Sequence, residues 1–100
     1  MNSNVRSYLR AQAHDLRPIV MVGKGGVNDS VIAALEEALV HHELVKIKFQ
    51  DFKGEVRPLS DQLAAATSAE VVSMVGFTAV LFRQNPKDPD RLIKIPANLL

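Results

Sequence analysis

The chain contains no cysteine and no tryptophan, and only one tyrosine among its 100 residues. The absence of cysteine excludes disulfide bonds and zinc sites built from thiolates. No apolar run reaches the roughly 20 residues that a membrane-spanning helix needs, and the first residues lack the basic segment and apolar run of a signal peptide. These absences favour a cytoplasmic protein with no membrane partner.

A large excess of either charge is also absent. Twelve Lys and Arg residues face eleven Asp and Glu residues, which gives a net charge of +1. The chain is therefore no polycation, and any affinity for nucleic acid has to come from a local basic patch. Its length and its 47% of hydrophobic residues suit one core, so we expect a single domain over residues 1–100.

Hydrophobic spacing predicts the first three elements of that domain. Residues 5–13 read as a short amphipathic helix that carries Arg6 and Arg10 one turn apart. The run 19–22 is short and continuously apolar, which is typical of a strand buried on both faces. A longer helix follows over 28–42, with a polar residue placed to cap its start.

Strict alternation over residues 44–49 predicts a strand with two different faces. One face carries three apolar side chains for the core: Val45, Ile47 and Phe49. The other carries Leu44 together with Lys46 and Lys48, which makes it a basic face.

The second half of the chain predicts one helix and a hairpin. The helix spans residues 56–67, and its inner stripe is expected to be Leu59, Leu63 and Ala66. Two apolar strands, 71–75 and 78–82, follow, and the two-residue link with glycine first favours a type II′ turn. A turn-rich segment over 85–90 and a short extended stretch over 92–95 end the chain.

The resulting order, αβαβαββ, predicts a single α/β (α+β) domain. The first two strands are expected to pair in parallel through a helical crossover, and the last two in antiparallel. This arrangement gives a four-stranded mixed sheet with the second and third helices on one face, while the position of the first helix stays open.

The most informative stretch is the glycine-rich loop between the first strand and the second helix. Gly23, Lys24, Gly25 and Gly26 combine a backbone without side chains and a cation, directly before the positive end of a helix dipole. This combination suits a phosphate group. The residues form neither the dinucleotide-binding motif nor the P-loop of nucleotide triphosphatases, but they fit the G-x-x-G loop that clamps nucleic-acid backbones in KH domains. A tight turn without any ligand is the alternative.

Several cations outside the loop are candidates for one basic patch. Lys46 and Lys48 share a strand face, Arg17 flanks the first strand, and Arg6 and Arg10 lie on the first helix. If they converge with Lys24, they can bind a phosphate backbone despite the near-neutral total charge. Solvated lysines that block edge pairing are the alternative.

No catalytic or metal-binding set emerges from the remaining polar residues. His41 and His42 are adjacent and point in directions roughly 100° apart on a helix, so they do not easily share one ion. His14 lies far from both, and no nucleophile, base and orienting group can be assembled by spacing. We therefore expect no enzyme activity, no metal, no cofactor and no small-molecule substrate.

Three ordered motifs add a family resemblance to this interpretation. Residues 9–18 contain A-H-x-L-x-P, residues 22–27 contain the G-x-x-G loop, and residues 38–48 contain A-L-x-x-H-E-L-[IV]-K-[VI]-K. Together they resemble the YhbY/CRM family of RNA-binding domains, and residues 69–83 resemble its final hairpin. The resemblance runs over about residues 5–96.

The resemblance implies a fold similar to the C-terminal domain of translation initiation factor three. It also implies RNA binding through the loop and the neighbouring basic surface, and stand-alone bacterial members are associated with precursors of the large ribosomal subunit. The expected partner is thus ribosomal RNA or a pre-ribosomal particle. The expected RNA-binding residues are Gly23, Lys24, Gly25, Gly26, Lys46, Lys48, Arg10 and Arg17.

Two positions depart from the family pattern, and two other functions stay open. Phe77 stands where the family turn usually has a basic residue, and Ser68 where glycine often closes the third helix.

The near-neutral charge and the apolar residues Phe77 and Leu44, expected to be exposed, allow an adaptor that binds a protein on ribosomal particles. The glycine loop also allows a small nucleotide-binding enzyme.

Overall fold

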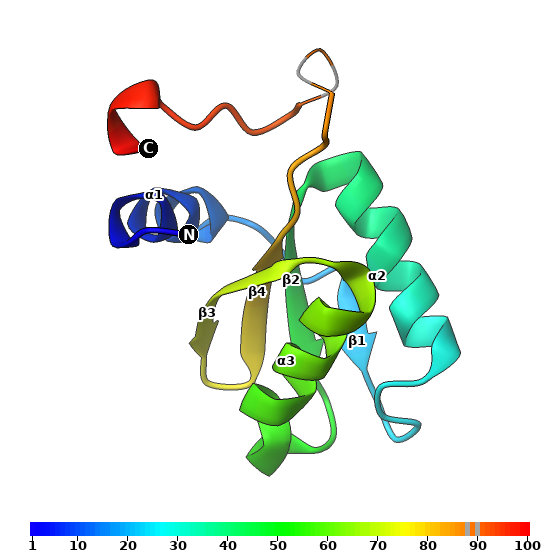
Figure 1. The fold of residues 1–100 in the computed structure, drawn as a ribbon. Coiled ribbons are helices and arrows are strands. Elements are labelled where there is room, and N and C mark those ends of the chain that lie inside the picture. Colours follow the sequence, from blue (N-terminus) through cyan, green and yellow to red (C-terminus); the bar gives the residue numbers. More distant parts are fainter. Residues whose placement is uncertain (88, 90) are drawn as a thin grey trace.

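The computed structural model of the protein describes residues 1–87, 89 and 91–100 (Figure 1). Positions 88 and 90, in the predicted turn-rich segment, lie outside the described residues. The order αβαβαββ is confirmed. The elements are α1 (Ser3–Ala13), β1 (Val20–Val22), α2 (Asp29–His42), β2 (Leu44–Phe49), η1 (Lys53–Glu55), α3 (Val56–Thr67), β3 (Glu70–Val75), β4 (Thr78–Phe82) and η3 (Ala97–Leu99).

The four strands form one mixed sheet in the order β1-β2-β4-β3. β1 pairs with β2 in parallel, and the other two pairs are antiparallel, as predicted. Between β3 and β4, Gly76 has a φ of +57° while Phe77 has a negative one, which agrees with the predicted type II′ turn.

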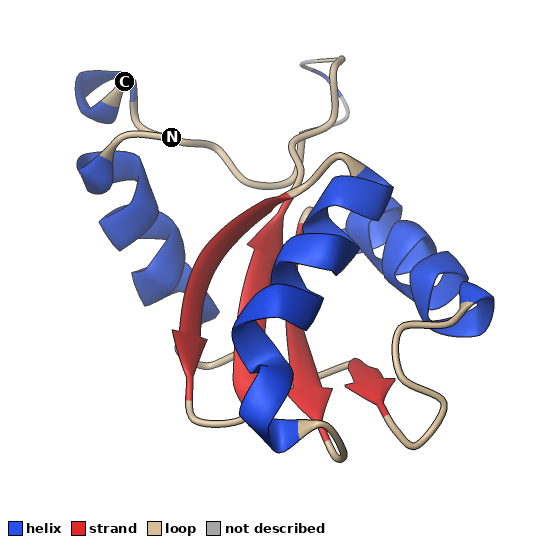
Figure 2. Cartoon of the chain, turned by 60° about the horizontal axis from the view of Figure 1, so that its bottom comes forward, coloured by secondary structure: helices blue, strands red, loops and turns tan. Residues whose placement is uncertain are grey.

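Each face of the sheet is covered by different elements (Figure 2). The predicted side is packed against α2 and α3 and holds the larger core, with Leu35, Ile47 and Leu63 fully buried. The opposite side is packed against α1 and the C-terminal segment, where Val5, Leu9 and Ala13 meet Leu44, Val72, Val80 and Phe82. This second cluster settles the position of the first helix.

This packing corrects the predicted exposure of Leu44, which is 3% exposed. Alternation correctly places its side chain on the same sheet face as the two lysines. However, α1 and the C-terminal residues Ile93 and Ile95 cover that end of the face. One strand therefore has a buried apolar end and an open basic end.

The first strand was also predicted wrongly, because it is not buried on both faces. Val20 and Val22 are buried, whereas Met21 is 42% exposed and the preceding Ile19 is 51% exposed. β1 is one of the two edge strands, and α1 packs over the strands on the far side of the sheet, so one face of β1 stays open.

Local capping explains how the helices begin and end. The side chain of Asn2 accepts the N–H of Val5, so α1 begins at Ser3 rather than at residue 5. On α3, Leu63 is buried as predicted, but Ala66 is exposed, and Ser60 and Thr67 lie on the inner side instead. Ser68 ends α3 with a φ of +56°, the left-handed conformation that glycine usually supplies.

Within the described residues, no helix is both long and apolar enough to span a membrane.

Candidate functional site

Three connections meet at one end of the sheet, where β1 and β2 finish and the β3–β4 turn lies (Figure 2). The N–H groups of Gln50 and Asp51 both donate to the carbonyl of Val22, at 2.9 and 3.3 Å, and so tie the segment after β2 to the end of β1. The N–H of Phe49 donates to the carbonyl of Phe77 at 2.7 Å, which ties the turn to the end of β2. The connection after β2 therefore lies beside the glycine loop, and the β3–β4 turn lies on the other side of β2.

The glycine loop presents its tip to solvent. The N–H of Gly26 donates to the carbonyl of Gly23 at 3.0 Å and closes the turn, while Lys24 and Gly25 at the tip are exposed. Among the residues that the structure describes, none accepts a hydrogen bond from the amide of Lys24 or Gly25. Two backbone donors and one ammonium group are thus available to an anion.

Two glycines of the loop are required by its geometry. Gly26 has a φ of +68°, which L side chains rarely adopt. A Cβ on Gly25 would lie 2.6 Å from Nδ2 of Asn28, the residue whose Oδ1 caps α2 by accepting the N–H of Val31 at 2.9 Å. Gly23 is different, because a Cβ there would meet nothing within 4 Å.

The helix dipole contributes less to this site than the sequence alone suggests. Asn28 already satisfies one amide of the first turn of α2, and Asp29 places a carboxylate in that turn. A negative side chain at this position takes up part of the favourable dipole field. The loop amides and Lys24 therefore carry more of any interaction with a phosphate.

The structure places Lys46 at the margin of the region that α1 covers and Lys48 on the open part of the sheet. Lys46 pairs with Val80 of β4, a member of the cluster under α1, and Lys48 pairs with Thr78, which lies outside that cluster. Lys46 is half-buried and Lys48 is exposed. Lys48 also lies opposite Met21 in the register with β1, two residues before the glycine loop. The basic face thus leads toward the loop.

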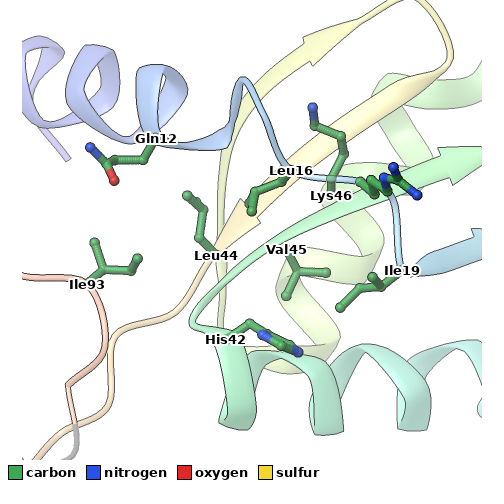
Figure 3. Close-up of a pocket in the computed structure, with 9 residues that line it drawn as sticks. Gln12, Leu16, Ile19, His42, Leu44, Val45, Lys46 and Ile93 are labelled. Carbon is green, nitrogen blue, oxygen red and sulfur yellow. The ribbon is translucent and has the colours of Figure 1, made fainter.

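Two pockets beside Lys46 extend this face to the remaining predicted cations. A pocket of about 280 Å³ is lined by Arg10, His14 and Lys46. A second, of about 290 Å³, is lined by Arg17 and Lys46, with Leu16, Ile19 and Leu44 among its apolar walls (Figure 3). Lys46 lines both pockets, so Arg10 and Arg17 approach the same lysine from two sides.

Arg6 does not join this set, although it lies only one helical turn from Arg10. Its Nη1 donates to the carbonyls of Val71 and Val72, at 2.6 and 3.0 Å. These carbonyls lie where the register between β3 and β4 shifts, so Arg6 satisfies backbone acceptors at an irregularity of the sheet. Its role is structural, and the expected group of six cations is reduced to five.

Among the residues that the structure describes, the five remaining cations have no acidic partner. Over the described residues, the ion pairs are those of the N-terminus with Glu70 and of Arg83 with Glu36. Neither pair involves a member of the set Arg10, Arg17, Lys24, Lys46 and Lys48. Their charge is therefore available to a ligand.

The sequence analysis missed Phe52 and Lys53, in the connection after β2. Phe52 is 43% exposed, and a Cβ on Gly26 would lie 3.4 Å from its Cε2, so the ring lies against the glycine loop. It also has a φ of +56°, a conformation that costs a side chain roughly 1–2 kcal/mol. The sequence signal was weak: an aromatic residue and a lysine directly before Gly54.

Lys53 places a cation at the turn that lacks one in the sequence. Its Nζ lies 5.0 Å from the ring centroid of Phe77, within the range of a cation–π interaction. Phe77 itself is 48% exposed. An ammonium group thus stands at the β3–β4 turn although Phe77 replaces the basic residue expected there. We call Gly26, Phe52, Lys53 and Phe77 the aromatic edge.

The histidines form no metal site with other ligand types within the described part of the chain. His14 lines the pocket with Arg10 and Lys46, while His42 lines the pocket near Arg17.

Comparison with known proteins identifies the family that shares this arrangement. Residues 1–83 match the family model described as the CRS1/YhbY (CRM) domain. The chain belongs to this family. The glycine loop, α2 and the lysine face of β2 all fall within the CRM match, whereas the C-terminal segment after β4 lies outside it.

Individual relatives are similar in sequence to this chain over most of their own length. YqeI of Bacillus subtilis, which is named a probable RNA-binding protein, is 34% identical over 92 residues, covering 91% of this chain and 94% of the relative. PA4753 of Pseudomonas aeruginosa, named in the same way, is 33% identical over 91 residues, covering 90% and 88%. The solution structure of SAV1595 from Staphylococcus aureus has a TM-score of 0.78 and 31% identity, and the match covers 96% of this chain and all of that one.

Proposed function

We propose that this chain is a non-enzymatic RNA-binding protein of the cytoplasm that assists assembly of the large ribosomal subunit. Membership of the CRM family and the names of two relatives support RNA as the ligand. One structural observation carries the proposal: the glycine loop exposes its tip amides, and Lys46, on the strand face that leads toward this loop, lines one pocket with Arg10 and another with Arg17, while none of the five cations forms an ion pair among the described residues.

Each part of this surface has a defined role in the proposal. The amides of Lys24 and Gly25 donate hydrogen bonds to a phosphate, and the Lys24 ammonium group neutralises it. Lys48 and Lys46 continue the contact across the sheet, and Arg10 and Arg17 extend it beside α1. All of these groups contact the sugar–phosphate backbone, so binding depends little on base sequence.

The ribosomal target follows from the resemblance to stand-alone bacterial CRM proteins. The family model matches residues 1–83. Contacts to the backbone suit a protein that holds a structured ribosomal precursor. In cells, crosslinking with readout of the contacted nucleotides should recover large-subunit ribosomal RNA, and recovery of unrelated RNA alone would contradict this part of the proposal.

The RNA-binding proposal is tested by measuring affinity for a labelled RNA against salt concentration. Neutralising about four phosphates gives a slope of log affinity against log salt of roughly −3. Lys24→Gln and Lys46→Gln should each weaken binding to different sequences alike and make the slope less steep by about 1. Lys87→Gln is the matched control, because Lys87 is exposed and lies outside both pockets. Salt-independent affinity in the wild type would refute the proposal.

The protein adaptor is the second candidate, but Leu44, one of the two apolar residues that favoured it, is buried. Phe77 remains exposed and keeps this function testable. Ribonuclease treatment should release an RNA-bound protein from ribosomal particles, whereas an adaptor bound to a ribosomal protein should still co-sediment.

A further inference from the structure

Phe52 and Phe77 are two half-exposed aromatic residues, one after β2 and one in the β3–β4 turn, at the end of the sheet that carries the glycine loop. Phe52 lies against Gly26 in the loop, and Lys53, the next residue, reaches over Phe77. The aromatic edge is therefore a connected row of contacts rather than two unrelated exposed side chains. Any strand held at the loop passes beside it.

The backbone of Phe52 gives a second, independent observation. Its positive φ is an outlier for a bulky side chain. The carbonyl of Phe52 accepts the N–H of Glu55 at 2.9 Å and so helps to start η1, but its side chain makes no capping hydrogen bond, so the start of that helix does not require the exposed ring. Strained residues that the surrounding structure holds in place cluster at binding sites. The strain here keeps a ring beside the loop and leaves much of it exposed.

Charge alone does not explain this edge. Lys53 contributes a cation, but Asp51 and Glu55 lie in the same connection and offset it. A ligand attracted only by charge would bind elsewhere on the basic face. Flat apolar rings next to a phosphate-binding loop match the chemistry of an unpaired base, whose face stacks on aromatic side chains while its phosphate stays polar.

We propose that Phe52 and Phe77 stack on unpaired bases of a single-stranded RNA segment whose backbone is held at the glycine loop. This inference rests on the RNA-binding function proposed above and specifies its ligand as single-stranded. Lys53 stays over one side of the Phe77 ring and is close enough to contact the phosphate of the stacked nucleotide. The two rings add affinity without adding to the salt dependence, because stacking neutralises no phosphate.

The absence of tryptophan makes this proposal directly measurable. Phe77→Trp introduces the only indole in the chain. Addition of a decauridylate should quench the fluorescence of this indole. The quenching should occur over the same concentration range in which the anisotropy of the labelled RNA shows binding. Val40→Trp is the matched control, since Val40 is 49% exposed on α2 and lines none of the pockets near the basic face. Its indole should not respond to the same RNA.

Affinity measurements provide the second readout. Phe52→Leu and Phe77→Leu should each weaken binding of decauridylate about fivefold or more, with an unchanged salt slope. An abasic strand with the same number of phosphates offers no base to stack. Both leucine variants should therefore bind it with the affinity of the wild type. Rescue of the affinity by Phe77→Trp would separate stacking from loss of an apolar contact.

The outcomes distinguish this inference from the proposed function. Anisotropy that rises without indole quenching, or leucine variants that bind as the wild type does, would overturn stacking and leave RNA binding intact. Preference for a duplex over the single strand would do the same. No RNA binding in the wild type would overturn both. Binding of an apolar peptide to the aromatic edge, with no RNA effect in the leucine variants, would assign the rings to a protein partner.

Discussion

The carboxylate of Glu43 accepts the backbone N–H of Ile93 at 2.7 Å, across 50 residues of sequence. The same carboxylate accepts the N–H of Leu92 at 2.7 Å and that of Asn85 at 2.5 Å. Glu43 is fully buried and has a φ of +60° at the end of α2. It therefore fixes the C-terminal segment that covers α1 and the buried end of the basic strand.

Glu43→Gln should reduce the free energy of unfolding by at least about 2 kcal/mol. A glutamine has one acceptor oxygen, and its NH₂ group would face backbone N–H donors that the carboxylate now satisfies. Urea denaturation measures the change. Glu37→Gln, an exposed position on the same helix, is the control and should stay within about 0.5 kcal/mol of the wild type. Equal midpoints for both variants would contradict the assigned role of Glu43.

Arg6→Ala should change the stability of the fold and Arg10→Ala the binding of RNA, although the two residues lie one helical turn apart. Arg6 binds two backbone carbonyls, so its loss should destabilise the protein by about 1.5–3 kcal/mol. Arg10→Ala should leave stability nearly unchanged and make the salt slope of RNA binding less steep by about 1. Thermal melts and salt titrations of both variants measure this. A reduced slope for Arg6→Ala with unchanged stability would place Arg6 among the RNA contacts.

Gly23→Ala tests whether RNA approaches the loop backbone closely. The new methyl group meets no protein atom within 4 Å, so the melting temperature should not change. RNA affinity should fall severalfold, because the methyl group keeps the phosphate away from the backbone. Gly26→Ala should instead destabilise the fold by about 1–2 kcal/mol, since φ is +68° there. If Gly23→Ala binds RNA normally, the strand does not pass over Gly23.

Ser68→Gly should stabilise the protein by about 0.5–1 kcal/mol. Ser68 has a left-handed φ of +56°, where glycine is favoured, and the N–H of Ala69 closes the end of α3 on the carbonyl of Ala64 at 2.9 Å. The gain in conformational fit is partly offset by the greater freedom of glycine in the unfolded chain. Urea denaturation measures the difference, and a loss of stability would show that the serine side chain contributes more than the relieved strain.

Local patterns in the sequence determined the elements and much of the loop. Alternation placed Lys46 and Lys48 on one face, and the glycine spacing identified the turn before α2, because both depend on the backbone geometry of adjacent residues. The parallel pairing of the first two strands also follows from local order, since an intervening helix has to cross over the sheet.

Tertiary structure alone decided which of these residues are exposed and which cations are available. Periodicity gives the direction of a side chain but not the element that covers it, so α1 and the C-terminal segment bury Leu44 while Met21 stays open. The same limit explains Arg6, which is bound by strand carbonyls 65 and 66 residues away. The position of Phe52 has the same cause. Its ring reaches the glycine loop only because the loop after β1 and the connection after β2 lie at the same end of the sheet.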